Sequence, residues 1–303
     1  MFRTSPGRRA ILGLALAAAL TTSMAACGSE SGDDNGAGSA PAASASADTS
    51  LADKVPADIK SAGKLIIGTD STYAPSEFLD ADGKTVIGFD VDLFNAVAQK
   101  LGLTTEWQSA TFDSIIPGVK TKKYNVGVSS FTINADRLKE ATMVSYFQAG
   151  TQWAAKAGAT VNADDVCGKK IAVQTATVQV DDLTARSKKC TDGGKAKITI
   201  DQYQAQSDAT NAVVTGKDLA MLADSPVCAY AVKQTNGQLA LVGDIYDSAP
   251  YGYVLPLDQK DTMGVAIQGA LKSLIDDGSY KTILAKWGVD AGGITDPAVN
   301  PAV

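Results

Sequence analysis

The sequence predicts an α/β fold with two lobes, in which mostly parallel sheets are flanked by helices. Short β-branched runs alternate with amphipathic segments through most of the chain, and this alternation is typical of parallel strands with helices on both faces. The alternation occurs in two series, one that ends in a helix beginning near Asn134 and one that starts at Ile171. Two lobes with a ligand-binding cleft between them are therefore expected.

The first series begins with a strand and a hairpin. Residues 65–68 form an aliphatic run that predicts a strand. Asp82 and Gly83 predict the turn of a hairpin, and residues 86–89 its second strand. The acidic residues near this turn are assigned to the turn and not to a calcium site, because the further acids of an EF-hand loop are missing.

A helix, a strand and a second helix complete the first series. From Asp90 to Leu101 the apolar residues recur at helical spacing, and Gly102 is placed to end that helix. Residues 126–129 predict a strand. Asn134 predicts the N-cap of the next helix, which has an acidic residue in its first turn.

The second series contains strands and helices in alternation. Its predicted strands span residues 171–173, 198–200, 219–222 and 239–242. Its predicted helices begin near Ala176, Ser207 and Ser225, and the third has Pro226 at its first position. Two further helices, near residues 262–275 and 280–287, are expected at the end of the chain.

Residues 1–26 predict an export signal. Three arginines precede an apolar stretch over residues 10–20, and a run of small residues leads to Cys27. This layout resembles a bacterial lipoprotein signal in which Cys27 is lipidated, although Ser23-Met24-Ala25 is also compatible with an ordinary signal peptidase. The Arg8-Arg9 pair leaves the choice between general and twin-arginine export open. The apolar stretch is too short to remain as a membrane-spanning helix.

Residues 27–52 predict a disordered tether. The stretch after Cys27 consists mainly of glycine, serine, alanine and acidic residues that cannot form a core. A coil of about 25 such residues spans on the order of 25 to 30 Å. The expected location is therefore outside the cytoplasm, on the outer face of the cell membrane and held there by a lipid anchor.

Composition excludes several classes of function. Without residues 1–26 the chain has 24 basic and 33 acidic residues, a net charge of −9, which disfavours binding to nucleic acid. The chain has no histidine, which removes the usual base for serine or cysteine nucleophiles and the commonest metal ligand. We therefore expect no cofactor and no metal, and we do not expect an enzyme.

Besides Cys27 the chain has three cysteines, and they lack the Cys-x-x-Cys spacing of zinc or redox sites. In an exported protein, Cys167 and Cys190 are expected to form a disulfide. It would close a loop of about 24 residues and stabilise the fold by about 3 kcal/mol. Cys228 is expected to be a small buried core residue.

Polar and aromatic residues near strand ends are candidates for a ligand-binding site. Arg137 lies just inside a predicted helix, where its planar guanidinium either binds a carboxylate or is simply solvated. Asp224 follows a predicted strand and either pairs with an ammonium or complements a helix dipole. Tyr73 and Phe112 are expected in loops, where they either enclose a ligand side chain or belong to the core.

Six segments together resemble the polar amino-acid solute-binding proteins of ABC importers, extracellular solute-binding protein family 3. They span residues 68–75, 88–93, 112–117, 129–137, 223–226 and 250–253. The resemblance covers residues 65–287 and implies the periplasmic-binding-protein type II fold, with hinge crossings near residues 146–153 and 246–254. It implies a first lobe of residues 53–149 and 252–303 and a second lobe of residues 150–251.

The same resemblance implies roles for eight residues. Arg137 would bind the ligand carboxylate, Asp224 would bind the ammonium, and Ser130 and Thr132 would contact both groups. Tyr73 and Phe112 would flank the ligand side chain, Val178 would offer a backbone N–H at a helix start, and Asp70 would face a cationic side chain.

Three positions depart from the family pattern. Ala176 stands where glycine is usual, Val178 where a hydroxyl residue is usual, and Ser76 where an aromatic residue is usual beside Tyr73. An acid at the position of Asp70 also occurs in members with other ligands. The expected ligand is therefore a polar L-amino acid, with only a slight preference for a cationic one.

The sequence thus predicts a monomeric, substrate-binding lipoprotein of an amino-acid ABC importer, which delivers its ligand to the transmembrane permease subunits. One alternative is a dehydratase of small carboxylates on the same scaffold, for which Glu77 is the acid we would test as the base. Another is a sensor or adhesin domain. The sequence leaves open which amino acid binds, how tightly, and which permease receives it.

Overall fold

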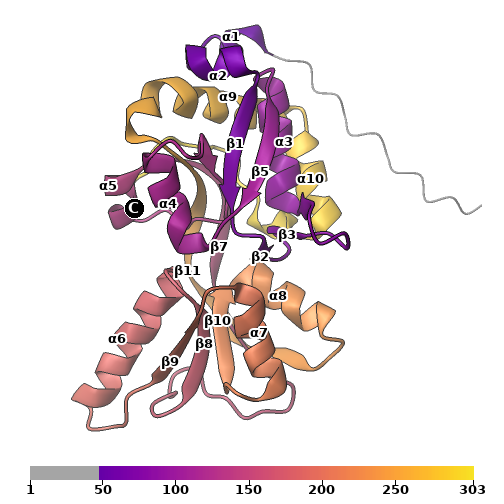
Figure 1. Ribbon diagram of the computed structural model, residues 1–303. Helices are drawn as coiled ribbons and strands as arrows, with labels where there is room; N and C mark the ends of the chain where they lie inside the picture. Colours follow the sequence, from indigo (N-terminus) through magenta and orange to yellow (C-terminus); the bar gives the residue numbers. More distant parts are fainter. Residues whose placement is uncertain (1–47) are drawn as a thin grey trace, which may run out of the picture. The chain divides into compact units, whose positions relative to one another are not determined.

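Residues 48–303 are described by the structure, which is a computed structural model. An eight-stranded sheet extends through both lobes in the order β5-β1-β6-β11-β7-β10-β8-β9 (Figure 1). Lobe 1 contains three parallel strands, β1 (Lys64–Thr69), β5 (Thr104–Ser109) and β6 (Val126–Gly127). Lobe 2 contains another three, β8 (Lys170–Gln174), β9 (Thr199–Tyr203) and β10 (Ala220–Asp224). The predicted α/β class with parallel sheets is confirmed.

Two long antiparallel strands connect the lobes. They are β7 (Thr142–Lys156) and β11 (Leu239–Leu255), which pair with each other along most of their length. The predicted strand over residues 239–242 is confirmed as the first part of β11, which continues beyond it to Leu255. Hydrogen bonds between β7 and β11 pair the backbone groups of the two strands where they cross between the lobes. The register is irregular between Val242 and Ala249, which allows β11 to bend where it leaves lobe 2.

Helices cover both faces of the sheet in each lobe (Figure 1). Lobe 1 carries α3 (Phe89–Lys100), α4 (Phe112–Lys120), α5 (Ala135–Glu140), α9 (Val265–Asp276) and α10 (Ser279–Trp287). Lobe 2 carries α6 (Val178–Asp192), α7 (Gln206–Thr215) and α8 (Ser225–Gln234). Short helical segments are α1 (Thr49–Ala52), α2 (Ala57–Ala62), η1 (Leu257–Gln259), η2 (Lys260–Gly264) and η3 (Asp290–Gly292). A small sheet of β2 (Thr72–Tyr73), β3 (Glu77–Leu79) and β4 (Val86–Ile87) lies in lobe 1.

Each lobe has a separate apolar layer on each face of its strands. In lobe 2, the neighbouring residues Met221 and Leu222 of β10 are both fully buried but belong to different layers. In lobe 1, Phe94 of α3 and Ile115 of α4 lie in two further layers. Successive strand residues point to opposite faces, so short β-branched strands that are buried on both sides give near-continuous apolar runs.

The structure differs from the predicted elements at several ends. Helix α6 starts at Val178 and not near Ala176, because Ala176 has a left-handed φ of 62° and Thr177 is the N-cap. The N-cap of α8 is Asp224 and not Ser225. Tyr73 lies in β2 and Phe112 is the first residue of α4, so neither lies in a loop as expected.

The predicted tether ends earlier than residue 52. Residues 49–52 form α1, capped by the side chain of Asp48, and the Asp48 N–H donates to the Lys100 carbonyl at the end of α3. Leu51 packs against lobe 1 beside Gly269 of α9, where a Cβ would collide with it. The apolar Leu51 therefore attaches this segment to the folded body. The export signal, Cys27 and the rest of the tether lie outside the described residues.

The predicted disulfide is confirmed. Cys167 and Cys190 are bonded, with their Cα atoms 5.6 Å apart, and they join the loop before β8 to the last turn of α6. Cys228 is buried with a free thiol. None of the helices in residues 48–303 is both long and apolar enough to cross a membrane.

Candidate functional site

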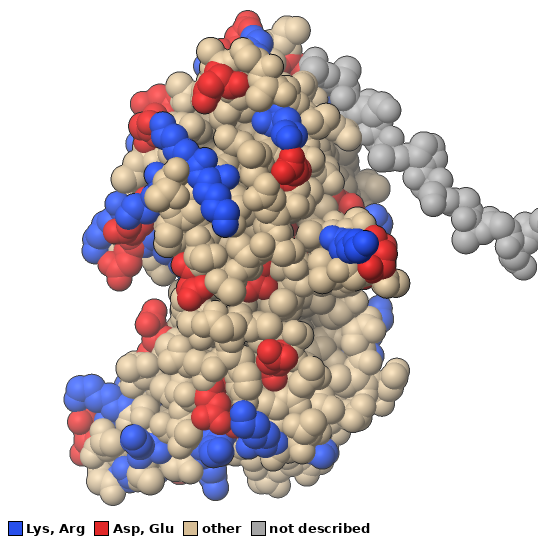
Figure 2. Space-filling view, in the orientation of Figure 1, with Lys and Arg blue, Asp and Glu red and all other residues tan. Residues whose placement is uncertain are grey.

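A cavity lies at the waist between the two lobes, at the level where the surface narrows (Figure 2). All eight residues predicted from the sequence line it: Asp70, Tyr73, Phe112, Ser130, Thr132, Arg137, Val178 and Asp224. Four further lining residues were not predicted: Ser129, Gln174, Thr177 and Gln179. The cavity volume is about 10 Å³, which is the space that one water molecule needs.

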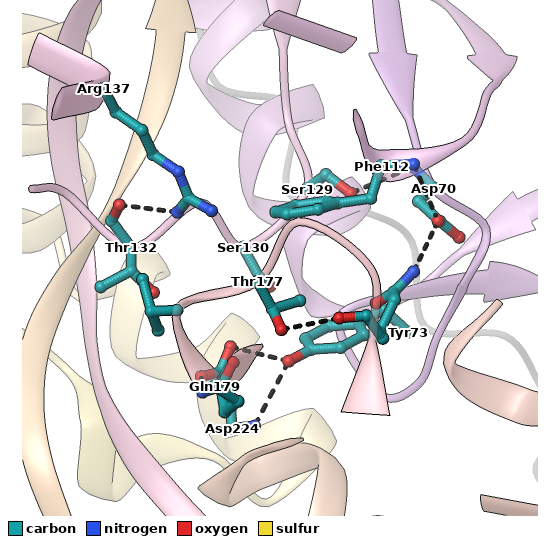
Figure 3. A pocket seen from close by; sticks show the side chains of 12 residues that line it. Asp70, Tyr73, Phe112, Ser129, Ser130, Thr132, Arg137, Thr177, Gln179 and Asp224 are labelled. Atoms are coloured by element: carbon teal, nitrogen blue, oxygen red, sulfur yellow. Dashed lines mark hydrogen bonds between the residues drawn. The ribbon is translucent and has the colours of Figure 1, made fainter. Parts of the chain in front are cut away.

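Arg137 reaches the cavity from α5 in lobe 1 (Figure 3). The Asn134 side chain caps this helix by accepting from the Arg137 N–H at 2.8 Å. The guanidinium donates to the Thr132 carbonyl at 2.8 Å and to the Ala176 carbonyl of lobe 2 at 3.2 Å. Arginine has five N–H donors, so most of them remain for a ligand. Burial lowers the pKa of Arg137 to about 10, which still leaves it a cation at neutral pH.

Two aromatic rings support the guanidinium. The rings of Phe112 and Phe131 stack with their centroids 4.6 Å apart, and the guanidinium carbon lies 5.4 Å from each centroid. Cation–π attraction and the apolar surroundings hold the side chain of Arg137 in one orientation. Phe112 is therefore both a wall of the cavity and a support for its cation.

Asp224 approaches the cavity from lobe 2, where it ends β10 and caps α8. Its carboxylate does not bond to the helix. It accepts from the Tyr73 hydroxyl of lobe 1 at 2.9 Å and from the Gln179 side-chain amide at 2.8 Å (Figure 3). Asp224 is only 5% exposed, and burial raises its pKa while these hydrogen bonds oppose the rise.

Asp70 follows β1 in lobe 1 and is 3% exposed. One carboxylate oxygen accepts from the N–H and the hydroxyl of Thr72. The other accepts from the Phe112 N–H at 3.1 Å and from the Gln174 side-chain amide of lobe 2 at 2.8 Å. Burial raises the pKa of Asp70, against the effect of these hydrogen bonds.

The start of α6 forms the opposite wall. The side chain of Thr177, the N-cap, donates to the Gln174 carbonyl at 2.8 Å and leaves the first turn uncapped. The first N–H groups of a helix have no partner within it, and the helix dipole favours negative charge there. Val178 and Thr177 line the cavity, so this helix end is directed toward it.

The four further residues were not among the predicted site residues, although they lie within five positions of one. Ser129 precedes Ser130, while Gln174, Thr177 and Gln179 belong to the turn and helix around Val178. Gln174 is the last residue of β8, and its position at the carboxyl end of a parallel strand could have identified it as a site residue. Gln179 gave no such signal, because its role depends on Asp224 of a distant strand.

In the described part of the chain, the charged side chains of this cavity form no direct ion pairs and balance each other only in part. Within residues 48–303, none of the ion pairs includes Asp70, Asp224 or Arg137. A buried charge without an ion partner is costly, although hydrogen bonds reduce the cost. Two carboxylates and one guanidinium thus give the cavity a net charge of −1 when all three are ionised.

The raised pKa values carry a stability cost with a defined sign. A carboxyl whose folded pKa exceeds its unfolded value binds more protons in the folded state. Asp70 and Asp224 therefore contribute stability below pH 3.8, and this contribution is lost as the pH rises from 3.8 through their raised pKa values. Ionising either carboxyl in the folded protein therefore costs folding free energy, which is typical of binding sites.

Residues 65–290 match the sequence profile of bacterial extracellular solute-binding proteins, family 3. The arginine-binding protein ArgT of Corynebacterium glutamicum is 35% identical over 249 residues, covering 81% of this chain and 81% of that protein. An ancestral arginine-binding protein bound to arginine superimposes with a TM-score of 0.69 at 30% identity, over 75% of this chain and 98% of that one. An ancestral amino-acid-binding protein that is a precursor of cyclohexadienyl dehydratase has a TM-score of 0.64 at 29% identity, over 76% and 97% of the two chains.

The Tyr73 hydroxyl is expected to help hold the lobes together. Tyr73→Phe removes its hydrogen bond to the buried Asp224 carboxylate, a contribution of about 1.5 to 3 kcal/mol. The ligand-free protein should therefore shift toward separated lobes by about tenfold or more, with a larger radius of gyration in small-angle X-ray scattering. Tyr203→Phe is the matched control, because its hydroxyl donates to Asp218 within lobe 2. Identical scattering from both variants would contradict this prediction.

Proposed function

This chain belongs to the bacterial extracellular solute-binding proteins of family 3, and we propose that its ligand is a cationic L-amino acid, with L-arginine as the first candidate. Its relatives are amino-acid-binding proteins, and it serves as a substrate-binding protein for an ABC transporter. The proposal of a cationic ligand rests on the charged groups of the cavity, two carboxyls and one guanidinium. A ligand with one carboxylate, one ammonium and one cationic side chain neutralises Arg137, Asp224 and Asp70 together.

The positions of these three groups fit the parts of such a ligand. The carboxylate would bind the free N–H groups of Arg137 and the start of α6, and the ammonium would bind Asp224 beside the hydroxyls of Ser130 and Thr132. The cationic side chain would extend between Tyr73 and Phe112 toward Asp70. There it would take the place of the Gln174 amide on the Asp70 carboxylate.

Binding would require the lobes to separate and close again. The cavity has room for about one water molecule, and direct hydrogen bonds already cross the waist from Tyr73 to Asp224 and from Gln174 to Asp70. We propose residues 53–149 with 252–303 and residues 150–251 as the two moving bodies, with β7 and β11 as the hinges. A ligand that bridges Arg137 and Asp224 would favour the closed form.

The resemblance to a precursor of a dehydratase raises the question of catalysis, and we propose that this chain is not an enzyme. Glu77, the acid considered as a base, is fully buried and is not among the residues that line the cavity. A general base must lie within hydrogen-bond reach of its substrate. Glu77 bonds instead to Ser129 behind the cavity wall.

We further propose that Cys27 carries a lipid anchor and that the protein acts as a monomer at the outer face of the cell membrane. The sequence around Cys27 and the family of extracellular proteins support this location. A tether would keep the receptor near its permease, so that the local concentration depends on tether length rather than on dilution in bulk solvent.

The proposed function is tested by a thermal-shift screen of the common L-amino acids against the purified protein. A ligand at 100 times its Kd should add about 2.7 kcal/mol to the unfolding free energy. Arg137→Lys keeps the charge but loses the planar fork, so its Kd for the ligand should rise about 100-fold. Arg186→Lys, an arginine that packs on aromatic rings outside this cavity, is the control. A screen without any shift would refute the proposal.

Asp70→Asn is expected to change the preference among ligands. Without the carboxylate, the Kd for arginine should rise by about tenfold or more, while the Kd for glutamine, measured by isothermal titration calorimetry, changes less. Asp113→Asn removes an exposed acid from the first turn of α4 and serves as the control. An equal loss for both amino acids would show that Asp70 is structural.

Cys27→Ala is expected to release the protein from the membrane. Cell fractionation should find the variant in the soluble fraction, and uptake of labelled arginine by whole cells should fall while the purified variant binds as before. Membrane association that persists in the variant would contradict the lipid anchor.

A further inference from the structure

Two carboxyl groups are buried against each other behind the cavity wall. Glu77 of β3 and Asp90 at the start of α3 are both 0% exposed, and they lie close enough for the charge of Asp90 to raise the pKa of Glu77. Within the described part of the chain neither belongs to an ion pair. One oxygen of each, Glu77 Oε2 and Asp90 Oδ1, has no hydrogen-bond donor among residues 48–303.

A glycine brings the two carboxyls together. Gly88 precedes α3 with a φ of 142°, and a Cβ at this position would collide with the Ser76 carbonyl. Because Gly88 has no side chain, the Phe89 N–H donates to the Pro75 carbonyl at 3.0 Å and the Asp90 N–H to the Ser76 carbonyl at 3.1 Å. The start of α3 therefore packs against the segment that carries Glu77.

A shared proton accounts for both unpartnered oxygens. Two ionised carboxylates in contact, without a cation, repel each other strongly in a buried site. If Glu77 is protonated, its O–H donates to Asp90 and both oxygens gain a partner. Burial and the charge of Asp90 raise the pKa of Glu77 well above its usual value, and burial raises the pKa of Asp90 to about 6. Both shifts and the two unpartnered oxygens favour a single proton shared by the pair, carried by Glu77.

Asp90 holds a strained residue of the cavity wall. Its Oδ2 accepts from the Ser130 N–H at 3.2 Å, from the Ser130 hydroxyl at 3.3 Å and from the Tyr146 hydroxyl at 2.5 Å. Ser130 has a φ of 50°, a left-handed conformation that costs free energy for a residue other than glycine. These bonds to a carboxylate offset that cost and link Ser130 to hinge strand β7 through Tyr146.

Glu77 holds the neighbouring part of the wall. Its Oε1 accepts from the Ser129 hydroxyl at 2.9 Å, and the Ser129 hydroxyl accepts from the Asp70 N–H at 3.0 Å. Ser129, Ser130 and Asp70 all line the cavity, whereas Glu77 and Asp90 do not. The two carboxyls therefore touch the wall from behind.

We propose that Glu77 and Asp90 form one proton-sharing unit that positions Ser129, Ser130 and Asp70 for ligand binding. Both are positioning residues, since neither reaches the cavity. The binding part of this inference rests on the proposed function of the cavity, while the shared proton does not.

Among residues 48–303, no lysine or arginine forms an ion pair with Glu77 or Asp90. The titratable groups that act on it are Asp70 after β1, Tyr146 on β7, Tyr253 on β11 and Tyr280 on α10. Each of these groups is neutral or negative at neutral to alkaline pH. Loss of the shared proton therefore adds a second negative charge that the surrounding elements do not neutralise.

The sign of the pH dependence follows from the raised pKa of Glu77. Above the unfolded value of 4.5, the folded protein binds more protons than the unfolded chain. The contribution of Glu77 to stability is therefore present below pH 4.5 and falls as the pH rises toward the folded pKa. Glu77→Gln keeps an N–H donor for Asp90 and an acceptor for Ser129, but it cannot lose a proton.

Ligand binding is tested by calorimetry with L-arginine from pH 7 to 9.5, on wild type, Glu77→Ala and Glu77→Gln. The alanine variant should raise the Kd about tenfold or more at pH 7, and glutamine should restore most of the affinity. The ratio of the wild-type Kd to that of Glu77→Gln should rise with pH by about threefold or more. Titration of the ligand itself affects all proteins equally and cancels in this ratio. Glu106→Gln, an exposed glutamate of β5, is the control and should follow wild type.

A ratio that stays constant with pH would overturn the positioning role, as would glutamine binding no better than alanine. If Glu77→Ala does not fold, the comparison of wild type with Glu77→Gln still decides the question. Thermal unfolding without ligand tests the proton separately. The Tm of wild type should fall relative to that of Glu77→Gln from pH 5 to 9, and parallel profiles would refute the shared proton. Failure of wild type to bind any amino acid would refute the proposed function alone.

Discussion

Burial of charge in the waist between the lobes is the constraint on which the site depends. Asp70 and Asp224 are buried and Arg137 is half-buried, and within residues 48–303 all three are held by hydrogen bonds and form no direct ion pair. Such an arrangement is costly for the folded protein, but it leaves each charge able to gain a partner from a ligand. Burying these charges without ion partners lowers the free energy of unfolding. A ligand of complementary charge would recover that free energy on binding.

At the N-termini of α8 and α6, the N-cap side chains form hydrogen bonds around the cavity and do not cap their own helices. Aspartate at an N-cap ordinarily accepts from the helix N–H groups, yet the carboxylate of Asp224 is directed to Tyr73 and Gln179. The hydroxyl of Thr177 likewise donates backward to Gln174 and leaves the start of α6 uncapped. Both helices therefore present unsatisfied or redirected polar groups to the same cavity. Pro226, which lacks an N–H, reduces the number of donors that α8 leaves without a cap.

The sequence predicted the elements whose cause is local and missed those whose cause is distant. The Asn134 cap and the glycine after Leu101 depend on neighbouring residues, and both were correct. The continuity of β11 through its hinge depends on pairing with β7, about 100 residues away, and periodicity alone did not reveal it. The site shows the same division. Arg137 and the other seven residues were placed through their motifs, whereas Gln179 depends on a contact with Asp224 that only the fold creates.

Selectivity follows from what a wrong ligand would leave unpaired. In the proposed binding mode, closing on any L-amino acid would replace the Tyr73–Asp224 contact with charge-assisted bonds to the zwitterion, so the shared part of the ligand would contribute to closure in every case. The ligand side chain would determine the difference in affinity between amino acids. The Gln174 amide would have to leave Asp70 when that side chain fills the space between Tyr73 and Phe112. A neutral side chain then leaves a buried carboxylate with one donor fewer, whereas a cation gives it a stronger partner. In the proposed mode, discrimination would therefore arise less from attraction to the correct ligand than from the penalty that Asp70 imposes on the others.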